Sequence, residues 1–232
     1  MAHIHLEDGA FTPFWIIVWT LLAAGLVGVT LLLIRRKKIS PRLVAIAAMC
    51  ASVGFAVFQV EIPTPIGPVH MNFTPLIGIL VGPGLGSLVV VVINIFSAAI
   101  GHGGWGMIGA NSLINMLEVS LAYYSFRFLK KKLKRSNYWS GFGATSIALT
   151  ASAFFVVLIV SISEIQGSQL TKEELVGNLL VLAVLNTIAG FIEGIVTGYV
   201  VSFLGRVRPD LLERGVQTSH AEPALVLASE VA

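Results

Sequence analysis

Seven apolar runs, separated by short polar stretches or Gly-Pro breaks, constrain this chain more than any other feature of its sequence. The runs occupy residues 12–34, 43–60, 73–81, 84–101, 107–129, 140–163 and 175–204. A helix needs about 20 apolar residues to cross the hydrocarbon core of a bilayer, with a range of roughly 17–25, so six of the runs are long enough. The third run is short, and Gly82-Pro83-Gly84 separates it from the fourth. The pattern predicts an all-α integral membrane protein.

The scarcity of charged residues agrees with this prediction. Only 12% of the 232 residues are Asp, Glu, Lys or Arg, whereas a typical soluble domain has about 25%. The mean hydropathy is +0.87. The single cysteine, Cys50, argues against a disulfide framework and a cysteine-based zinc cluster. We therefore exclude a soluble domain, and the absence of a Walker A loop or a nucleic-acid motif predicts no nucleic-acid partner.

The positions of the basic residues predict the orientation of the helices, because cytoplasmic loops carry an excess of Lys and Arg. Three clusters hold all but one of them: Arg35, Arg36, Lys37, Lys38 and Arg42; Arg127, Lys130, Lys131, Lys132, Lys134 and Arg135; and Arg206, Arg208 and Arg214. If run 73–81 crosses the membrane, or pairs with the fourth run in an equivalent way, all three clusters lie on one side. We predict a bundle of about seven transmembrane segments, with the N-terminus outside and the C-terminus cytoplasmic. Residues 1–204 would form one transmembrane domain in the cell membrane, and residues 205–232 a short cytoplasmic tail.

Four of the five histidines lie on the outer side in this topology: His3, His5, His70 and His102. Imidazole is a good ligand for Zn, Cu and Ni, although each histidine alone is also an ordinary polar loop residue. The start Met1-Ala2-His3 offers an amine, two backbone amides and an imidazole. These nitrogens can surround Ni(II) or Cu(II) in a square plane, unless the Met-Ala-His start is a chance occurrence.

The loop from Glu61 to Asn72 is the second candidate element of a metal site. It contains Pro63, Pro65 and Pro68, and proline fixes φ and removes backbone donors. The loop should therefore be stiff and non-helical, presenting His70 at the outer end of the third run. One imidazole held in this way would complete a metal site; the alternative is a loop shaped only to join two spans.

Two further patterns lie inside the spans. Asn111, Asn115 and Glu118 are spaced i, i+4 and i+7, so they share one helix face. This face should point into the bundle, because charge in hydrocarbon is costly. Its residues either have a functional role or form hydrogen bonds between helices. Glu193 lies within a doubled G-x-x-x-G pattern, Gly190 to Gly198, which predicts close helix packing.

Small residues recur every four positions in the second run. The two rows are Ala47 and Ala51, and Ala48, Ser52 and Ala56. Small side chains allow a second helix to approach closely. The rows predict either internal packing or a contact with a partner subunit.

Three stretches of the sequence are similar to the NikM/CbiM type of substrate-binding (S) component of energy-coupling factor transporters. They are His5-Leu6-Glu7-Asp8-Gly9; Phe58-Gln59-Val60-Glu61-Ile62-Pro63 followed by His70; and Ile100 to Asn111, a glycine-rich loop that ends in Gly-Ala-Asn. The resemblance implies a membrane receptor, not an enzyme, that binds Ni(II) or Co(II) from outside as its transported substrate and has no cofactor. An S component for a vitamin is the alternative.

The resemblance also implies a ligand set. Family members use the N-terminal amine, the amide and side chain of the histidine after Met, and the loop histidine, which here is His70. In this chain Ala2 separates Met1 from His3, and Ile4 precedes His5. The following acid and glycine favour His5, whereas chelate geometry favours His3, so both stay open. Asn72, His102 and Asn111 are candidates to orient the ligands.

Partners follow from the same resemblance. It implies a transmembrane scaffold (T) subunit, paired ATPase subunits and a small auxiliary membrane subunit, all in the lipid bilayer. We assign the scaffold contact to the small residues Ala47, Ala48, Ala51, Ser52 and Ala56. Two other classes are disfavoured. A retinal protein needs a lysine in its last span, and run 175–204 has none. An intramembrane metalloenzyme would need a H-E-x-x-H helix or paired acids beside a bound water, and the sequence shows neither.

Overall fold

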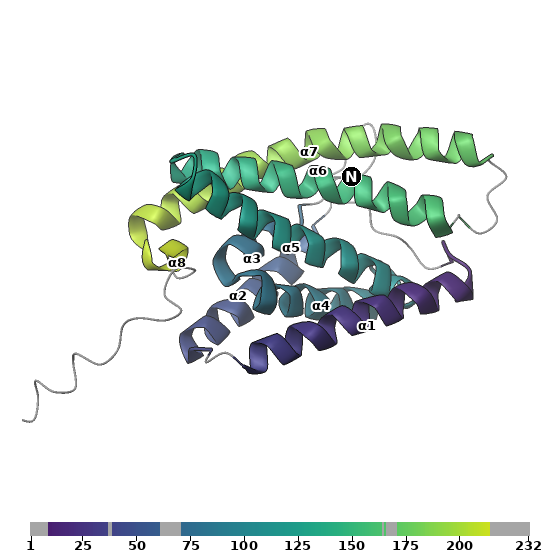
Figure 1. Cartoon of the computed structure of the whole chain (residues 1–232), viewed down its shortest axis with the longest axis horizontal. Coiled ribbons are helices and arrows are strands. Elements are labelled where there is room, and N and C mark those ends of the chain that lie inside the picture. Colours follow the sequence, from purple (N-terminus) through teal and green to yellow (C-terminus); the bar gives the residue numbers. More distant parts are fainter. Residues whose placement is uncertain (1–8, 37–38, 61–70, 164, 166–170, 214–232) are drawn as a thin grey trace, which may run out of the picture.

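The computed structural model describes residues 9–36, 39–60, 71–163, 165 and 171–213. In this part of the chain every regular element is a helix, and each of the seven apolar runs forms one (Figure 1). The elements are α1 (Pro13–Arg35), α2 (Pro41–Phe58), α3 (Thr74–Val81), α4 (Pro83–Ala99), the 3-10 helix η1 (Trp105–Met107), α5 (Ile108–Lys131), α6 (Asn137–Ser163), α7 (Lys172–Val207) and α8 (Asp210–Glu213).

Four of the described helices, α1, α2, α6 and α7, are long and apolar enough to cross a membrane. Helix α1 buries only 6% of its most apolar 18-residue window. Its large side chains, such as Phe14, Leu21 and Leu32, are exposed. In water such a surface would be a binding or aggregation site, whereas the hydrocarbon of a bilayer covers it at no cost. The described residues therefore form an all-α membrane protein.

The short third run differs from the prediction that it crosses the membrane. Helix α3 has eight residues and rises about 12 Å, less than half of a hydrocarbon core of about 30 Å. It begins at Thr74, which is fully buried inside the bundle. It ends at Gly82, and a side chain added at Gly84 would lie 3.3 Å from Ile34, near the end of α1. Helix α3 is thus a half-length helix that starts inside the bundle and runs to the end where α1 finishes.

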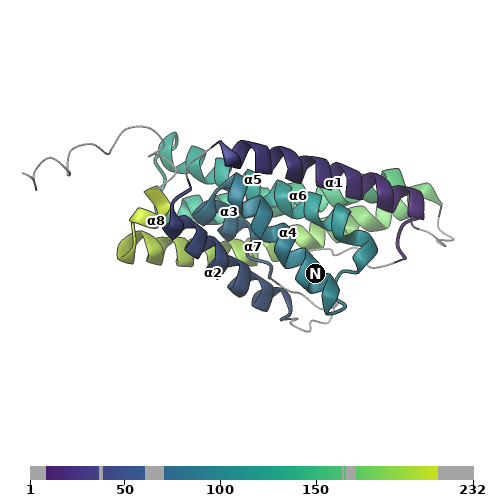
Figure 2. The same cartoon turned by 90° about the horizontal axis from the view of Figure 1, so that it is seen from below.

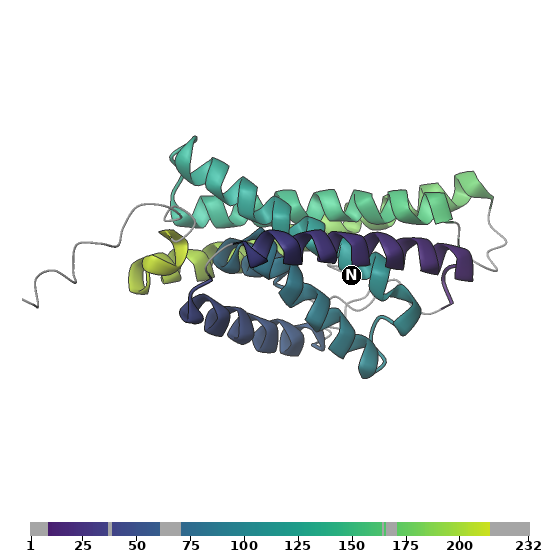
Figure 3. The ribbon, with the colours of Figure 1, turned by 60° about the horizontal axis from the view of Figure 1, so that its bottom comes forward.

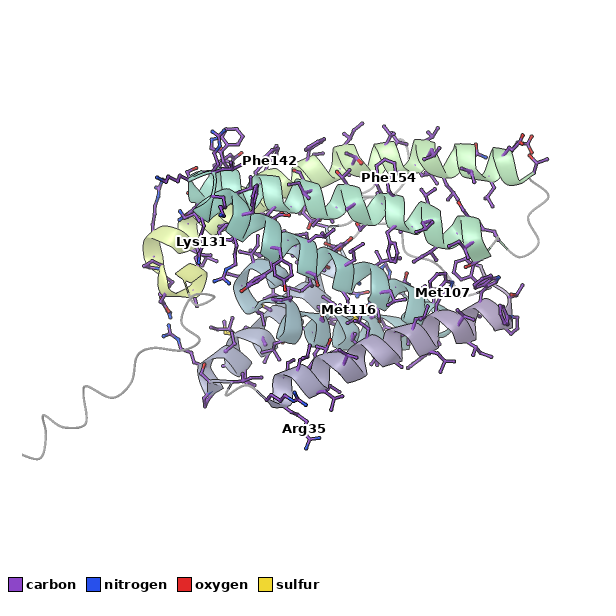
Figure 4. All side chains as sticks on the ribbon, viewed as in Figure 1. Arg35, Met107, Met116, Lys131, Phe142 and Phe154 are labelled. Carbon is purple, nitrogen blue, oxygen red and sulfur yellow. The ribbon has the colours of Figure 1, made fainter. Side chains whose placement is uncertain are left out.

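The described residues of the three basic clusters gather at one end of the bundle, which we call the basic end. Arg35 and Lys131 lie toward this end and Met107 toward the other (Figure 4). Tyr138 and Tyr199 make an edge-to-face contact here, with ring centroids 5.0 Å apart, and tyrosine is enriched where helices meet the membrane surface. The described basic residues therefore lie at one end of the bundle, and their cytoplasmic orientation stays a prediction.

Glycines hold α7 closely against α6 (Figure 3). A Cβ added at Gly194 would lie 3.1 Å from the carbonyl oxygen of Phe142, and one at Gly198 would lie 3.0 Å from that of Tyr138. Only glycine allows two helices to approach each other this closely. The close packing predicted from the doubled G-x-x-x-G pattern is confirmed.

The bundle continues beyond residue 204, where the sequence placed the end of the last span. Helix α7 runs to Val207, and α8 folds back beside the start of α2 (Figure 2). Leu212 packs beside a buried cluster that includes Phe126 and Val201. An ion pair between Asp210 and Arg42 joins α8 to α2. Residues 205–213 therefore belong to the packed structure.

Candidate functional site

The four predicted metal ligands, Met1, His3, His5 and His70, lie outside the described residues. Within the described part of the chain no three His, Cys, Asp or Glu side chains are grouped as a metal site. The structure does describe the residues that follow the two segments carrying these ligands, residues 1–8 and 61–70. Phe11 follows the first segment closely, and Asn72 follows the second.

The backbone just after His70 is held by a carboxylate from another helix. Asn72 is fully buried, and its backbone N–H donates to Glu193 Oε2 at 3.2 Å. The backbone N–H of Phe73 donates to Glu193 Oε1 at 3.1 Å. Glu193 lies on α7 and is itself fully buried. One carboxylate therefore satisfies a buried and a partly buried backbone donor that no helix or sheet would pair.

A second buried carboxylate holds the side chain of the same asparagine. Asn72 Nδ2 donates to Glu118 Oε2 of α5 at 3.0 Å, and Asn72 Oδ1 accepts the N–H of Thr74 at 3.0 Å. Phe73 adopts a left-handed φ of 51°, which is uncommon for a residue other than glycine. We call Asn72, Phe73, Glu118 and Glu193 the Asn72 clamp. It joins the end of the His70 loop to α5 and α7 and starts α3.

The other end of the same loop is anchored on α4. Gln59 Nε2 donates to Ser97 Oγ at 3.2 Å, and the backbone N–H of His102 donates to the carbonyl of Ser97 at 2.9 Å. His102 lies between Gly101 and Gly103, which both have a φ of +85°, a conformation that glycine adopts without strain. The glycine-rich loop therefore places His102 beside the residue that holds Gln59.

Helix α5 connects these parts through its polar face. Asn111 Nδ2 donates to the carbonyl of Gly103 at 3.3 Å, and Asn115 Nδ2 donates to Asn94 Oδ1 on α4 at 3.0 Å. Two turns after Asn111, Glu118 reaches the clamp. All three predicted residues of this face are buried, as their spacing indicates. The face contacts the glycine-rich loop, α4 and the clamp in turn.

The N-terminal segment enters the bundle against the same helix. Phe11 is 1% exposed and belongs to a buried cluster with Met107, Ala110 and Ile114. Helix α1 lies directly on the start of α5, since a Cβ at Gly109 would lie 2.6 Å from the backbone nitrogen of Thr20. The residues that follow both ligand-bearing segments therefore contact α5.

The small residues of α2 do not form one surface, which corrects the predicted partner contact. Ala47 is 5% exposed and packs in the core. Ala51 is half-buried and packs against the same core cluster. Ala48, Ser52 and Ala56 are exposed. The second row lies on the surface, and Ala51 lines a hollow between α2 and α4 together with Ser52.

Sequence reasoning treated Glu193 as part of a packing motif and missed its contacts. One feature of the sequence could have indicated these contacts: Glu193 is the only acidic residue in the apolar run 175–204. An ionisable side chain inside a membrane span marks a functional position by default. Its partner, the backbone of residues 72 and 73, could not be read from the sequence.

The fold and this buried polar frame define the class: a multi-pass, all-helical protein of the plasma membrane. Residues 5–211 match the CbiM family, described as "Cobalt uptake substrate-specific transmembrane region". The chain belongs to this family. It is therefore a substrate-specific component of cobalt and nickel uptake, which is a transport role rather than an enzymatic one.

Named relatives extend over nearly the whole chain. A Methanocorpusculum labreanum protein named for cobalt transport, CbiM 1, is 27% identical over 98% of this chain and 100% of its own length. The cobalt transport protein CbiM of Sorangium cellulosum is 27% identical over 91% of this chain and 95% of its own. An Archaeoglobus fulgidus protein named for fused nickel transport, NikMN, is 28% identical over 97% of this chain and 73% of its own.

Two crystal structures share the fold. One, of a truncated transition metal transporter, has a TM-score of 0.76 at 19% identity and covers 88% of this chain and 99% of its own. The other, of a transition metal transporter, has a TM-score of 0.75 at 18% identity and covers 92% and 98%.

Proposed function

We propose that the chain is the substrate-binding membrane subunit of an energy-coupling factor ABC transporter that takes up Ni(II) or Co(II). The observation that carries this proposal is the Asn72 clamp together with the packing of Phe11. Both ligand-bearing segments lead directly into buried positions against α5. The proposed topology places the N-terminus and the His70 loop outside and the basic end in the cytoplasm.

The proposed site is built from nitrogen ligands. The metal enters from outside, loses water and is bound by the Met1 amine, backbone amide nitrogen, His3 or His5, and His70. Loss of an amide proton adds negative charge that partly neutralises the dication. Asn72, His102 and Asn111 orient the two segments rather than bind the metal. A planar set of four nitrogens favours nickel.

The first prediction concerns the ligands. His70→Ala, and a chain lacking residues 1–3, are each expected to lose at least tenfold in Ni(II) affinity, because each removes nitrogens from the plane. The measurement is a metal titration of the purified chain, followed by absorption for the band of low-spin planar Ni(II). His3→Ala compared with His5→Ala shows which imidazole binds.

His220→Ala is the matched control, because it removes an imidazole from the C-terminal tail and should leave the titration unchanged. If neither the truncation nor His70→Ala changes Ni(II) binding, the N-terminal site is wrong. A purified chain that binds neither Ni(II) nor Co(II) would favour an S component for a vitamin.

The second prediction concerns the scaffold subunit, which we place on the exposed row Ala48, Ser52 and Ala56. The double change Ala48→Leu and Ser52→Leu is expected to reduce uptake in cells at least tenfold, because bulk there holds a partner helix away. Metal binding by the purified chain should be unchanged. Ala24→Leu, on the exposed side of α1, is the control; uptake that survives the double change would place the partner elsewhere.

A further inference from the structure

An apolar groove with a volume of about 440 Å³ runs between α2 and α3 and ends beside α8. Its walls include Ala45, Met49 and Val53 of α2 and Leu76 and Leu80 of α3. Met49 and Val53 are 68% and 58% exposed, so the groove opens on the outer surface of the bundle. In a protein that spans a membrane, this surface meets lipid or another membrane protein.

The depth of the groove matches one leaflet. It extends along α2 from Arg42 to Gly54, a rise of about 18 Å. Half of a hydrocarbon core of about 30 Å is about 15 Å. The groove therefore starts at the basic end and stops near the middle of the membrane, as one acyl chain does.

The mouth of the groove carries two guanidinium groups. Arg42 and Arg208 line it and both bind Asp210, with Arg208 Nε 3.0 Å from Asp210 Oδ1. The shared carboxylate holds the two cations side by side, and both remain half-exposed. The net charge of the three groups is +1, and guanidinium binds phosphate with paired hydrogen bonds.

We infer that this groove binds an anionic phospholipid of the leaflet at the basic end. One acyl chain lies between α2 and α3, and the phosphate lies at Arg42 and Arg208. Basic pockets between helices on the cytoplasmic side of a membrane bind anionic head groups in this way. The inference needs no assumption about the metal ligands.

The deep end of the groove reaches the Asn72 clamp. Phe73 lines the groove with its side chain, while its backbone N–H donates to Glu193. An acyl chain in the groove would therefore pack against a residue of the clamp and hold it in place. Bound lipid is expected to raise the melting temperature of the chain.

The test is native mass spectrometry of the full chain in detergent, with added phosphatidylglycerol or phosphatidylcholine as probes. Wild-type chain should retain phosphatidylglycerol at least tenfold better than phosphatidylcholine. Arg42→Ala with Arg208→Ala should abolish this preference, and so should Ala45→Trp, which fills the groove. Asp210→Asn should strengthen retention, because it removes the competing carboxylate.

Two matched controls separate the groove from general attraction of anionic lipid to the basic end. Arg35→Ala with Arg36→Ala removes the same charge outside the groove, and Ala24→Trp adds the same bulk to α1. Both should behave as wild type. Equal retention of the two lipids, or an equal loss in the Arg35/Arg36 variant, would overturn the inference. A third result would also overturn the inference. If the groove retains no lipid and its residues become protected only in the assembled transporter, the groove binds a protein partner instead.

Discussion

Glu193→Ala is expected to be among the most destabilising single changes in this chain. It removes the acceptor of the buried backbone N–H of Asn72 and of the partly buried N–H of Phe73. An unsatisfied buried donor costs about 1–3 kcal/mol, so we expect about that loss from Asn72 and a smaller one from Phe73. A large fall in melting temperature should result, together with weaker Ni(II) binding, because only Met71 separates His70 from the released backbone.

Two glutamine variants make this result specific. Glu193→Gln keeps one carbonyl oxygen as an acceptor and should fall between the alanine variant and the wild type. Glu173→Gln removes an exposed acid in the first turn of the same helix and should change neither the melting temperature nor metal affinity. If Glu193→Ala melts at the wild-type temperature, the clamp does not hold the loop.

Gly78→Ala is expected to disrupt the bundle although it adds a single methyl group. The new Cβ would lie 2.9 Å from the Cα of Val119 and closer still to its carbonyl oxygen. These are backbone atoms of α5, so no side-chain rotation can relieve the overlap. We expect a loss of about 3 kcal/mol or more, the upper range for overpacking, seen as a lower melting temperature and a lower yield of purified chain.

Gly25→Ala is the matched change for this experiment, because Gly25 is also helical and has no atom within 4 Å of its added Cβ. Alanine is favoured over glycine in a helix by up to about 1 kcal/mol. The melting temperature of this variant should therefore stay the same or rise. Equal behaviour of the two variants would mean that α3 and α5 are farther apart than the structure has them.

Much of the architecture could be predicted because it depends on local composition. Each apolar run became a helix, and the basic clusters gathered at one end. The half-length α3 was harder, because a run apolar on all sides has no periodicity to show whether it crosses. The two rows of small residues on α2 posed the same difficulty: Ala47 and Ala48 are neighbours in sequence, yet one is buried and the other exposed.

The clamp lay beyond sequence reasoning for a different reason. The bond between Glu193 and the backbone of Asn72 joins residues 121 positions apart, and the donors to this carboxylate are backbone N–H groups, which every residue except proline has. An ionisable side chain in a membrane span indicates that it has a polar partner. The sequence does not indicate which backbone N–H group that partner is. Only the three-dimensional arrangement identifies which loop Glu193 holds.

The length of α7 has a consequence for how the molecule meets its surroundings. At 36 residues it extends for about 54 Å. Even when tilted by 40° it spans about 41 Å along the membrane normal, more than the hydrocarbon core of about 30 Å. Charged residues at both ends, Glu173 and Glu174 in the first turn and Arg206 in the last, place both ends of the helix outside the hydrocarbon. The first turn of α7, away from the groove and from the exposed row Ala48, Ser52 and Ala56, is therefore a water-facing epitope to which an antibody fragment could bind while metal is loaded.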